Sequence, residues 1–309
     1  MRNIAFLWWE ENVGFGEKPF DWDTKREEYR KFSQIAREKD IRIVLGEYRW
    51  YTSGSLEKCW VFDGEWKKKE DIEIEGVYDL FHLDDEKMEY KKRMKEEVGI
   101  MDDPELTKIC HDKLLTYQEF PEMVPETRKA TDEDIRDILS TYGKAVLKPR
   151  RGSSGDGIIK VESEEFPDID EDEYVVQRFM ETEGTKKTDF EGIHDLRVLM
   201  INGEIQYAYI RSPNKGFRSN LAKGGTLEYV DVYELPEDTM DIVDEVRERF
   251  SGYAPSVLTV DLMYDEFQRP WILELNTQPG IGYHGEERVK EKELPVMKKL
   301  VDAVSELAD

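Results

Sequence analysis

Residues 257–276 read VLTVDLMYDEFQRPWILELN, two apolar runs separated by a short turn. Each run has the length and composition of a buried β-strand, and the spacing predicts that the two strands pair as a hairpin. Three oxygen-bearing side chains interrupt the apolar pattern, namely Asp261, Glu274 and Asn276. Residues two apart on a strand point to the same face, so Glu274 and Asn276 point together, and pairing of the strands would bring Asp261 beside them.

These three side chains predict a binding site for Mg²⁺ or Mn²⁺. Hard oxygen ligands suit a cation that is held by carboxylates together with nucleotide phosphates. The alternative is structural, because a carboxylate between apolar neighbours is costly to bury without a partner. In that case arginine side chains or backbone N–H groups would satisfy the two acids, and the strand pattern alone leaves both interpretations open.

A second stretch, residues 148–157, reads KPRRGSSGDG and lies between two predicted strands. Its glycines allow the backbone to approach a ligand closely, and its backbone N–H groups can bind phosphate oxygens. Lys148 at its entry supplies a positive charge. The stretch is not a P-loop, because the G-x-x-x-x-G-K-[ST] pattern is missing and no helix is predicted after it. Taken by itself, it is also typical of a plain hairpin turn.

The N-terminal part of the chain predicts an α/β unit. Residues 3–8 and 41–45 read as strands on either side of a helix at 24–38, an order that favours a partly parallel sheet. The hydrophobic spacing predicts further helices at 84–97, at 106–120, from the N-cap Thr131 to Gly143, at 239–250 and at 286–307, the last broken at Pro295. Further strands are expected at 145–149, 158–161 and 174–180, and at 195–201 and 205–210 joined by an Asn202-Gly203 turn.

The composition excludes several classes of protein. The chain has 309 residues, 45 Lys+Arg against 70 Asp+Glu, and a formal net charge of −25. Nucleic acids and anionic lipids need a positive surface, so neither is an expected partner. No apolar run reaches the ~18 residues that span a membrane. Two cysteines, Cys59 and Cys110, do not make a disulfide framework, and we expect reduced thiols in a cytoplasmic protein.

Positive charge is nevertheless concentrated in two segments. Residues 144–160 and residues 196–225 each contain five basic residues and one acid. In such an acidic chain, basic segments predict a focused site for an anion. Chance clustering is the alternative for either segment taken alone.

The motifs together resemble the ATP-grasp ligases. Lys113 in HDKLLTYQEF and Lys148 in VLKPRRGSSGDGI precede YVVQRFME, HDLRVLMINGE, FRSNLAKGGT, VDLM and ILELNTQPGIG, in the order of that superfamily. The resemblance covers residues 105–285 and is greatest to the branch of glutathione synthetase, the ribosomal-protein glutamate ligases and D-alanine–D-alanine ligase. It implies a mixed α/β, ATP-grasp fold in which two α+β subdomains clasp ATP. The implied units are an N-terminal α/β domain at 1–104, a lid subdomain at 105–184 and a metal and substrate subdomain at 185–309.

The resemblance also implies roles for individual residues. The ATP phosphates and adenine region would contact Lys113 and Lys148, and the lid would contain Gly152, Ser153, Ser154, Gly155 and Gly157. The adenine hinge would be Gln177, Arg178, Phe179 and Met180, with Glu181 or Glu183 at the ribose; Arg178 stands where an acid is common in the family. The metal ligands would be Asp261, Glu274 and Asn276. Arg197 and Arg211 would hold phosphate oxygens or a substrate carboxylate, and the implied catalytic residues are Arg197, Arg211 and Asn276. The substrate would contact Arg211, Arg218, Asn220 and Lys223.

The implied reaction joins a carboxylate to an amine through an acylphosphate and releases ADP and phosphate. The expected substrates are amino acids or short peptides, and a homodimer or homotetramer is compatible with the family. Two alternatives are a phosphotransferase, which stops at a phosphorylated product, and an ATP-binding regulatory protein without turnover. The complete set of metal-binding residue types argues against a pure binder. ADP release that depends on an added amine would distinguish a ligase from both.

Overall fold

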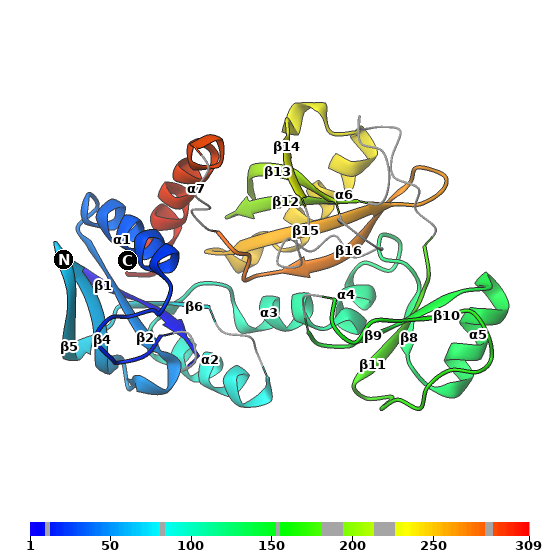
Figure 1. Ribbon diagram of the computed structural model, residues 1–309, viewed down its shortest axis with the longest axis horizontal. Helices are drawn as coiled ribbons and strands as arrows, with labels where there is room; N and C mark the ends of the chain where they lie inside the picture. Colours follow the sequence, from blue (N-terminus) through cyan, green and yellow to red (C-terminus); the bar gives the residue numbers. More distant parts are fainter. Residues whose placement is uncertain are drawn as a thin grey trace.

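The computed structural model describes residues 1–9, 13–80, 84–152, 155–180, 194–212, 226–281 and 287–308. Within these residues the chain forms three β-sheets, of seven, four and five strands, each with helices packed on it (Figure 1). The mixed α/β class predicted from the sequence is thereby confirmed. In the described part of the chain, no helix is both long and apolar enough to cross a membrane.

The N-terminal sheet has the strand order β3-β4-β2-β1-β6-β7, and β5 pairs with β4. Strand β1 (Arg2–Trp8) is parallel to both β2 (Ile41–Glu47) and β6 (Gly76–Asp79), so the predicted partly parallel sheet is confirmed. Helix α1 (Asp23–Arg37) connects β1 to β2 and buries Tyr29 and Phe32. The remaining elements of this unit are β3 (Tyr51–Thr52), β4 (Ser55–Asp63), β5 (Glu65–Glu73), β7 (Gly99–Ile100), α2 (Asp85–Glu97) and the 3-10 helix η1 (Tyr48–Trp50).

The second sheet has the order β10-β9-β11-β8 and carries helix α5 (Asp132–Tyr142). Thr131 caps this helix by accepting the backbone N–H of Asp134, and Gly143 ends it in the left-handed conformation at φ 75°. Both ends were predicted from local sequence, because such caps depend only on neighbouring residues. The strands of this sheet are β8 (Thr127–Lys129), β9 (Ala145–Pro149), β10 (Ile159–Val161) and β11 (Tyr174–Arg178).

The third sheet, with the order β14-β13-β12-β15-β16, packs against helix α6 (Glu237–Arg249). Asn202 and Gly203 join β12 to β13 with φ values of 50° and 75°, as expected for an Asn-Gly hairpin turn. Its strands are β12 (Asp195–Ile201), β13 (Glu204–Ser212), β14 (Thr226–Val230), β15 (Val257–Tyr264) and β16 (Pro270–Asn276). Two 3-10 helices flank α6, η3 (Val232–Glu234) and η4 (Ser251–Tyr253).

Two helix predictions differ from the structure. The segment predicted as one helix at 106–120 is two helices, α3 (Pro104–His111) and α4 (Lys113–Glu119), because Asp112 leaves the helical conformation and caps α4. The predicted break at Pro295 is absent, since α7 (Glu287–Ser305) continues through the proline. The buried face of α7, which includes Val296 and Leu300, packs into the core, and this packing offsets the hydrogen bond that a proline removes.

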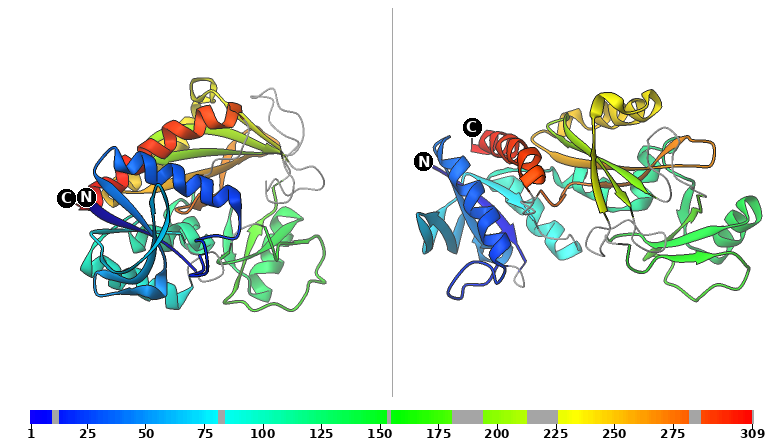
Figure 2. Two further views of the ribbon diagram at one scale, coloured as in Figure 1. Left: turned by 60° about the vertical axis from the view of Figure 1, so that its left-hand side comes forward. Right: turned by 45° about the horizontal axis from the view of Figure 1, so that its top comes forward.

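The C-terminal end of the chain returns to the N-terminal sheet. Helix α7 lies beside α1, and the two termini are close together (Figure 2). After α7, the short helix η5 (Glu306–Ala308) brings Leu307 against the strand pair β6–β7. A Cβ atom on Gly99 would lie 2.2 Å from the Leu307 carbonyl oxygen, and one on Gly76 would lie 2.6 Å from the Leu307 Cβ. Only glycine therefore permits this close approach at positions 76 and 99. The division into three units at residues 104 and 184 remains a prediction. Helix α7, which belongs to the third predicted unit, contacts the first one through α1 and β6.

A buried ion pair lies at the carboxyl end of β6. Asp79 forms an ion pair with Lys91 of α2, and both side chains are 0% exposed. Lys91 also donates to the carbonyl oxygen of Met101 at 3.3 Å. The second oxygen of Asp79 accepts a hydrogen bond from Gln278 Nε2 at 2.9 Å, from the loop that follows β16. The pair thus connects the N-terminal sheet to the end of the third sheet.

Replacing Lys91 by methionine would remove the positive charge that pairs with Asp79 and leave the Asp79 carboxylate buried. We expect the free energy of unfolding to fall by about 3–5 kcal/mol, the usual consequence of breaking a buried pair from one side. Chemical denaturation measures this change. Lys92→Met is the control, because the neighbouring Lys92 pairs with Glu89 on the surface and should cost about 1 kcal/mol or less. Equal losses in the two variants would contradict the prediction.

Candidate active site

The predicted acidic site lies on one face of the third sheet. Strands β15 and β16 pair antiparallel, with Asp261 opposite Glu274 and Thr259 opposite Asn276. Opposed residues share a face, as do residues two apart, so all three predicted side chains are on the same side. The hairpin that the sequence predicted is therefore confirmed.

Asp261 is the centre of an ion-pair network on this face. Its carboxylate, 1% exposed, accepts hydrogen bonds from Arg197 Nε at 2.6 Å and Arg197 Nη2 at 2.5 Å. Arg211 donates from Nη2 to the same carboxylate at 2.7 Å and from Nε to Asp195 at 2.6 Å. Burial alone would raise the pKa of Asp261, but the charges of Arg197 and Arg211 outweigh it and hold that pKa below its ordinary value. Arginine side chains therefore satisfy Asp261, as the structural alternative for this acid predicted.

Glu274 is placed differently. Its side chain is 26% exposed, and its carboxylate lies 3.9 Å from the ammonium group of Lys113. Lys113 is the first residue of α4 and also donates to the backbone carbonyl of Gly152 at 2.9 Å. A basic residue from the α3–α4 segment thus bridges the acidic sheet face and the start of the glycine-rich segment.

Lys148 occupies the middle of the second sheet, on β9. The side chain is 7% exposed and donates to Gln177 Oε1 at 2.6 Å, while Gln177 Nε2 donates to Thr127 Oγ1 at 2.7 Å. Burial, together with the positive charge of Lys113, lowers the pKa of Lys148 from 10.5 to about 8, against the opposing effect of Glu274. A buried ammonium group with few partners is suited to receive an anion.

The glycine-rich segment begins where β9 ends. Gly152, Gly155 and Gly157 have φ values of 132°, 68° and 72°, which side chains rarely adopt. At Gly157 a Cβ atom would also lie 2.9 Å from Pro149 Cγ and 2.9 Å from the Tyr174 hydroxyl. Ser153 and Ser154 lie outside the described residues.

The predicted hinge segment follows β11. Arg178 donates its backbone N–H to Glu126 O at 2.9 Å, and its guanidinium lies over the rings of Tyr142, at 5.0 Å, and Trp271, at 5.9 Å. Phe179 and Met180 come directly after the strand, and Met180 is buried. Five predicted residues of the hinge and of the second basic segment lie outside the described residues: Glu181, Glu183, Arg218, Asn220 and Lys223.

The site includes residues that the sequence predictions did not name. Asp195, two residues before Arg197 on β12, supports Arg211, and Thr127 on β8 supports Gln177. Asp195 could have been predicted from its spacing to Arg197, because alternate residues on a strand share a face and Asp195 therefore lies on the same side of the sheet. Thr127 had no such signal. Among the described residues, no three His, Cys, Asp or Glu side chains lie together as a metal-binding group.

Comparison with solved structures defines the class of fold. An ATP-grasp ligase from Chryseobacterium gregarium, associated with a RiPP and solved with ADP and a leader and core peptide, superposes with a TM-score of 0.59 at 14% identity, over 100% of this chain and 98% of that chain. D-alanyl-alanine synthetase A from Vibrio cholerae superposes with a TM-score of 0.63 at 14% identity, over 99% and 98% of the two chains. The chain therefore has the ATP-grasp fold.

Comparison of sequences defines the family. The profile of the family described as "Prokaryotic glutathione synthetase, ATP-grasp domain" matches residues 112–266, and the chain belongs to this family. Glutathione synthetase from Yersinia pestis is 28% identical over 200 residues, which are 62% of this chain and 59% of that protein. The match thus spans less than two thirds of the length of this curated relative.

The lowered pKa of Lys148 predicts a particular dependence of stability on pH. Between pH 8 and 10.5 the folded protein has released the Lys148 proton while the unfolded chain retains it, so the stability of the wild type rises with pH in that window. Lys148→Met lacks this rise. The stability of the variant relative to wild type should therefore fall by about 3 kcal/mol from pH 8 to 10.5. Denaturant titrations of both proteins across this range measure it, and a constant difference would contradict the assignment.

Proposed function

We propose that this protein is an ATP-dependent ligase that joins a carboxylate to an amine. The observation that carries the proposal is the convergence of Lys113, Arg197 and Arg211 around two carboxylates on one sheet face, in a chain of the glutathione synthetase ATP-grasp family. Lys148, Arg197 and Arg211 come from the two segments, 144–160 and 196–225, in which five basic residues stand against one acid in a chain of net charge −25. Such a site suits a polyanionic nucleotide and a second, carboxylate-bearing substrate.

In this proposal the phosphates of ATP lie between the second and third sheets. Lys113 and Lys148 offer the charges, and the backbone of the glycine-rich segment offers N–H donors through Gly152, Ser153, Ser154, Gly155 and Gly157. The adenine lies against the segment Gln177–Met180, with Glu181 or Glu183 at the ribose. The Gln177 side chain accepts a hydrogen bond from Lys148, which supports a role for that side chain in orienting the lysine rather than in direct contact with the base.

The residues present are compatible with a Mg²⁺ or Mn²⁺ ion. Glu274 and Asn276 offer two oxygens on one face. Asp261 accepts three N–H groups from the arginines, whereas a carboxylate has about four lone-pair positions, so its capacity as a third ligand is small but not exhausted. The bound ion would neutralise phosphate charge. In this arrangement Glu274 is the principal carboxylate ligand and Asp261 mainly orients the arginines.

The proposed chemistry has two steps. A substrate carboxylate oxygen attacks the γ-phosphorus of ATP, the bond to ADP breaks, and an acylphosphate forms. An amine then attacks the acyl carbon, the bond from that carbon to the phosphate oxygen breaks, and the departing phosphate takes up the amine proton. Arg197 and Arg211 would stabilise the charge that develops on the phosphoryl and carboxylate oxygens. They would do so through guanidinium N–H groups other than those that Asp261 and Asp195 accept.

The proposed carboxylate substrate is an amino acid or a short peptide. Arg211 is held at the edge of the acidic face by Asp195, a position from which Arg218, Asn220 and Lys223 follow along the chain. We propose these four as substrate contacts. Cys59 and Cys110 are free and buried, which fits the proposed reducing, cytoplasmic setting and gives them no part in the reaction.

ADP release under defined conditions tests the function. The protein is incubated with ATP, Mg²⁺ and pools of amino acids and short peptides, and ADP is measured with and without an added amine. We expect release that requires both a carboxylate and an amine. ADP release that needs no amine and leaves a phosphorylated substrate would indicate a phosphotransferase. Tight ATP binding without ADP release would indicate a regulatory protein.

Glu274→Gln should raise the Mg²⁺ concentration needed for half-maximal ADP release by about tenfold or more, because an amide oxygen is a much weaker ligand than a carboxylate. The fold should be retained, since Glu274 is partly exposed. Glu228→Gln is the matched control, because Glu228 is an exposed residue of β14 in the same sheet. An unchanged Mg²⁺ requirement in Glu274→Gln would refute the assignment of the ligand.

A further inference from the structure

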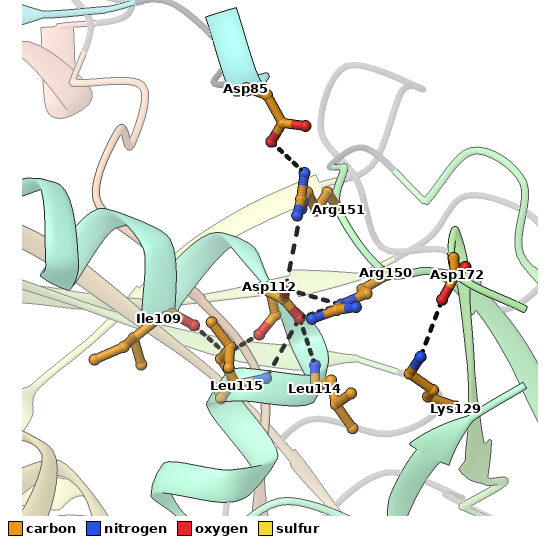
Figure 3. A network of polar contacts seen from close by, with 10 residues as sticks. Asp85, Ile109, Asp112, Leu114, Leu115, Lys129, Arg150, Arg151 and Asp172 are labelled. Atoms are coloured by element: carbon orange, nitrogen blue, oxygen red, sulfur yellow. Dashed lines mark hydrogen bonds and ion pairs between the residues drawn. The ribbon is translucent and has the colours of Figure 1, made fainter. Parts of the chain in front are cut away.

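Asp112 lies at the bend between α3 and α4 and makes more polar contacts than a helix cap requires. Its carboxylate, 5% exposed, accepts the backbone N–H groups of Leu114 at 3.0 Å and Leu115 at 3.3 Å, which caps α4. The same carboxylate accepts Arg150 Nε, at 2.9 Å on one oxygen and 2.8 Å on the other (Figure 3). Arg150 is two residues before Gly152, at the entry to the glycine-rich segment.

Backbone contacts reinforce this connection. Asp112 and Arg151 form an isolated antiparallel bridge, and Lys113 donates its backbone N–H to Arg150 O at 3.0 Å. The Lys113 side chain reaches further, to Gly152 O at 2.9 Å. Residues 150–152 are thus attached to the first turn of α4 at several points, across 38 residues of sequence.

The chemistry of this contact requires a carboxylate. Serine caps a helix about as well as aspartate, so capping alone does not need a charged group. An almost fully buried carboxylate is costly unless it is paired. Arg150 Nε supplies the nearer charge at 2.8 Å, and Arg151 Nε lies 3.9 Å from the same carboxylate. By contrast, the outer contact of this network, Arg151 with Asp85, joins side chains that are 49% and 92% exposed and is therefore weak.

We propose that Asp112 is a positioning residue that holds Lys113 and the entry of the glycine-rich segment in register with each other. This inference rests on the proposed function, in which both elements bind the phosphates of ATP. A carboxylate that anchors both before the nucleotide arrives reduces the entropy lost on binding. Asp112 itself acts through Lys113 and Arg150 and does not touch the nucleotide.

The test measures the affinity of a non-hydrolysable ATP analogue with Mg²⁺ by calorimetry, together with the thermal stability of each variant. Asp112→Ser keeps a capping side chain for α4 but removes the ion pair with Arg150. We therefore expect the ATP analogue to bind at least about tenfold more weakly, with little change in melting temperature. Asp103→Ser is the matched control. Asp103 caps α3 in the same way through the N–H of Glu105, and its side chain pairs with Lys95 of α2 instead of the glycine-rich segment.

A second variant approaches the same contact from the other side. Arg150→Gln should weaken binding to a similar degree, and the double variant Asp112→Ser/Arg150→Gln should bind no more weakly than either single variant, because both remove one interaction. If Asp112→Ser folds poorly, the affinity of Arg150→Gln alone decides the question, because that variant keeps the Asp112 cap of α4.

The outcomes separate this proposal from the proposed function. Wild-type protein that fails to bind the analogue would refute the nucleotide site, and the positioning role with it. Wild-type protein that binds, with Asp112→Ser and Arg150→Gln binding equally well, would refute the positioning role alone. Additive losses in the double variant would also refute it, because the two residues would then act separately.

Discussion

One carboxylate shared between two arginines organises the candidate active site. Asp261 is buried as an anion because Arg197 binds both of its oxygens and Arg211 binds one of them. The arrangement needs the antiparallel register in which Arg197 of β12 lies directly opposite Asp261 of β15. A slip of one residue would turn every side chain of the strand to the other face. The register of the third sheet therefore sets where the positive charge lies.

Buried ionisable groups also mark the places where the N-terminal sheet meets the rest of the chain. Asp79 pairs with Lys91 and accepts a hydrogen bond from Gln278, just beyond β16. Asp102 accepts the backbone N–H of Val257, the first residue of β15, at 2.7 Å. Burial raises the pKa of Asp102 well above its ordinary value, which favours the neutral acid there. These contacts position the open end of the β15–β16 hairpin, at the start of β15 and just after β16, and this hairpin bears Asp261, Glu274 and Asn276.

The two strand acids have different surroundings. Asp261 is satisfied by arginines, as the structural interpretation required. Glu274 is partly exposed beside Lys113, and its role as a metal ligand is a proposal. The distinction follows from position in the sheet, because β15 is flanked on one side by β12 and its arginine, whereas β16 is the edge strand.

The sequence by itself determined those features that depend on near neighbours. The Thr131 cap with Gly143, the Asn202-Gly203 turn and the 257–276 hairpin were all predicted, because each depends on residues a few positions apart. The ordered motifs likewise indicated the ATP-grasp fold. The tertiary structure decided the break at Asp112, whose partner Arg150 is 38 residues away, and the pairing of Asp261 with arginines 64 and 50 residues away. Such ion pairs depend on which distant strands and loops become neighbours, and local periodicity carries no information about that.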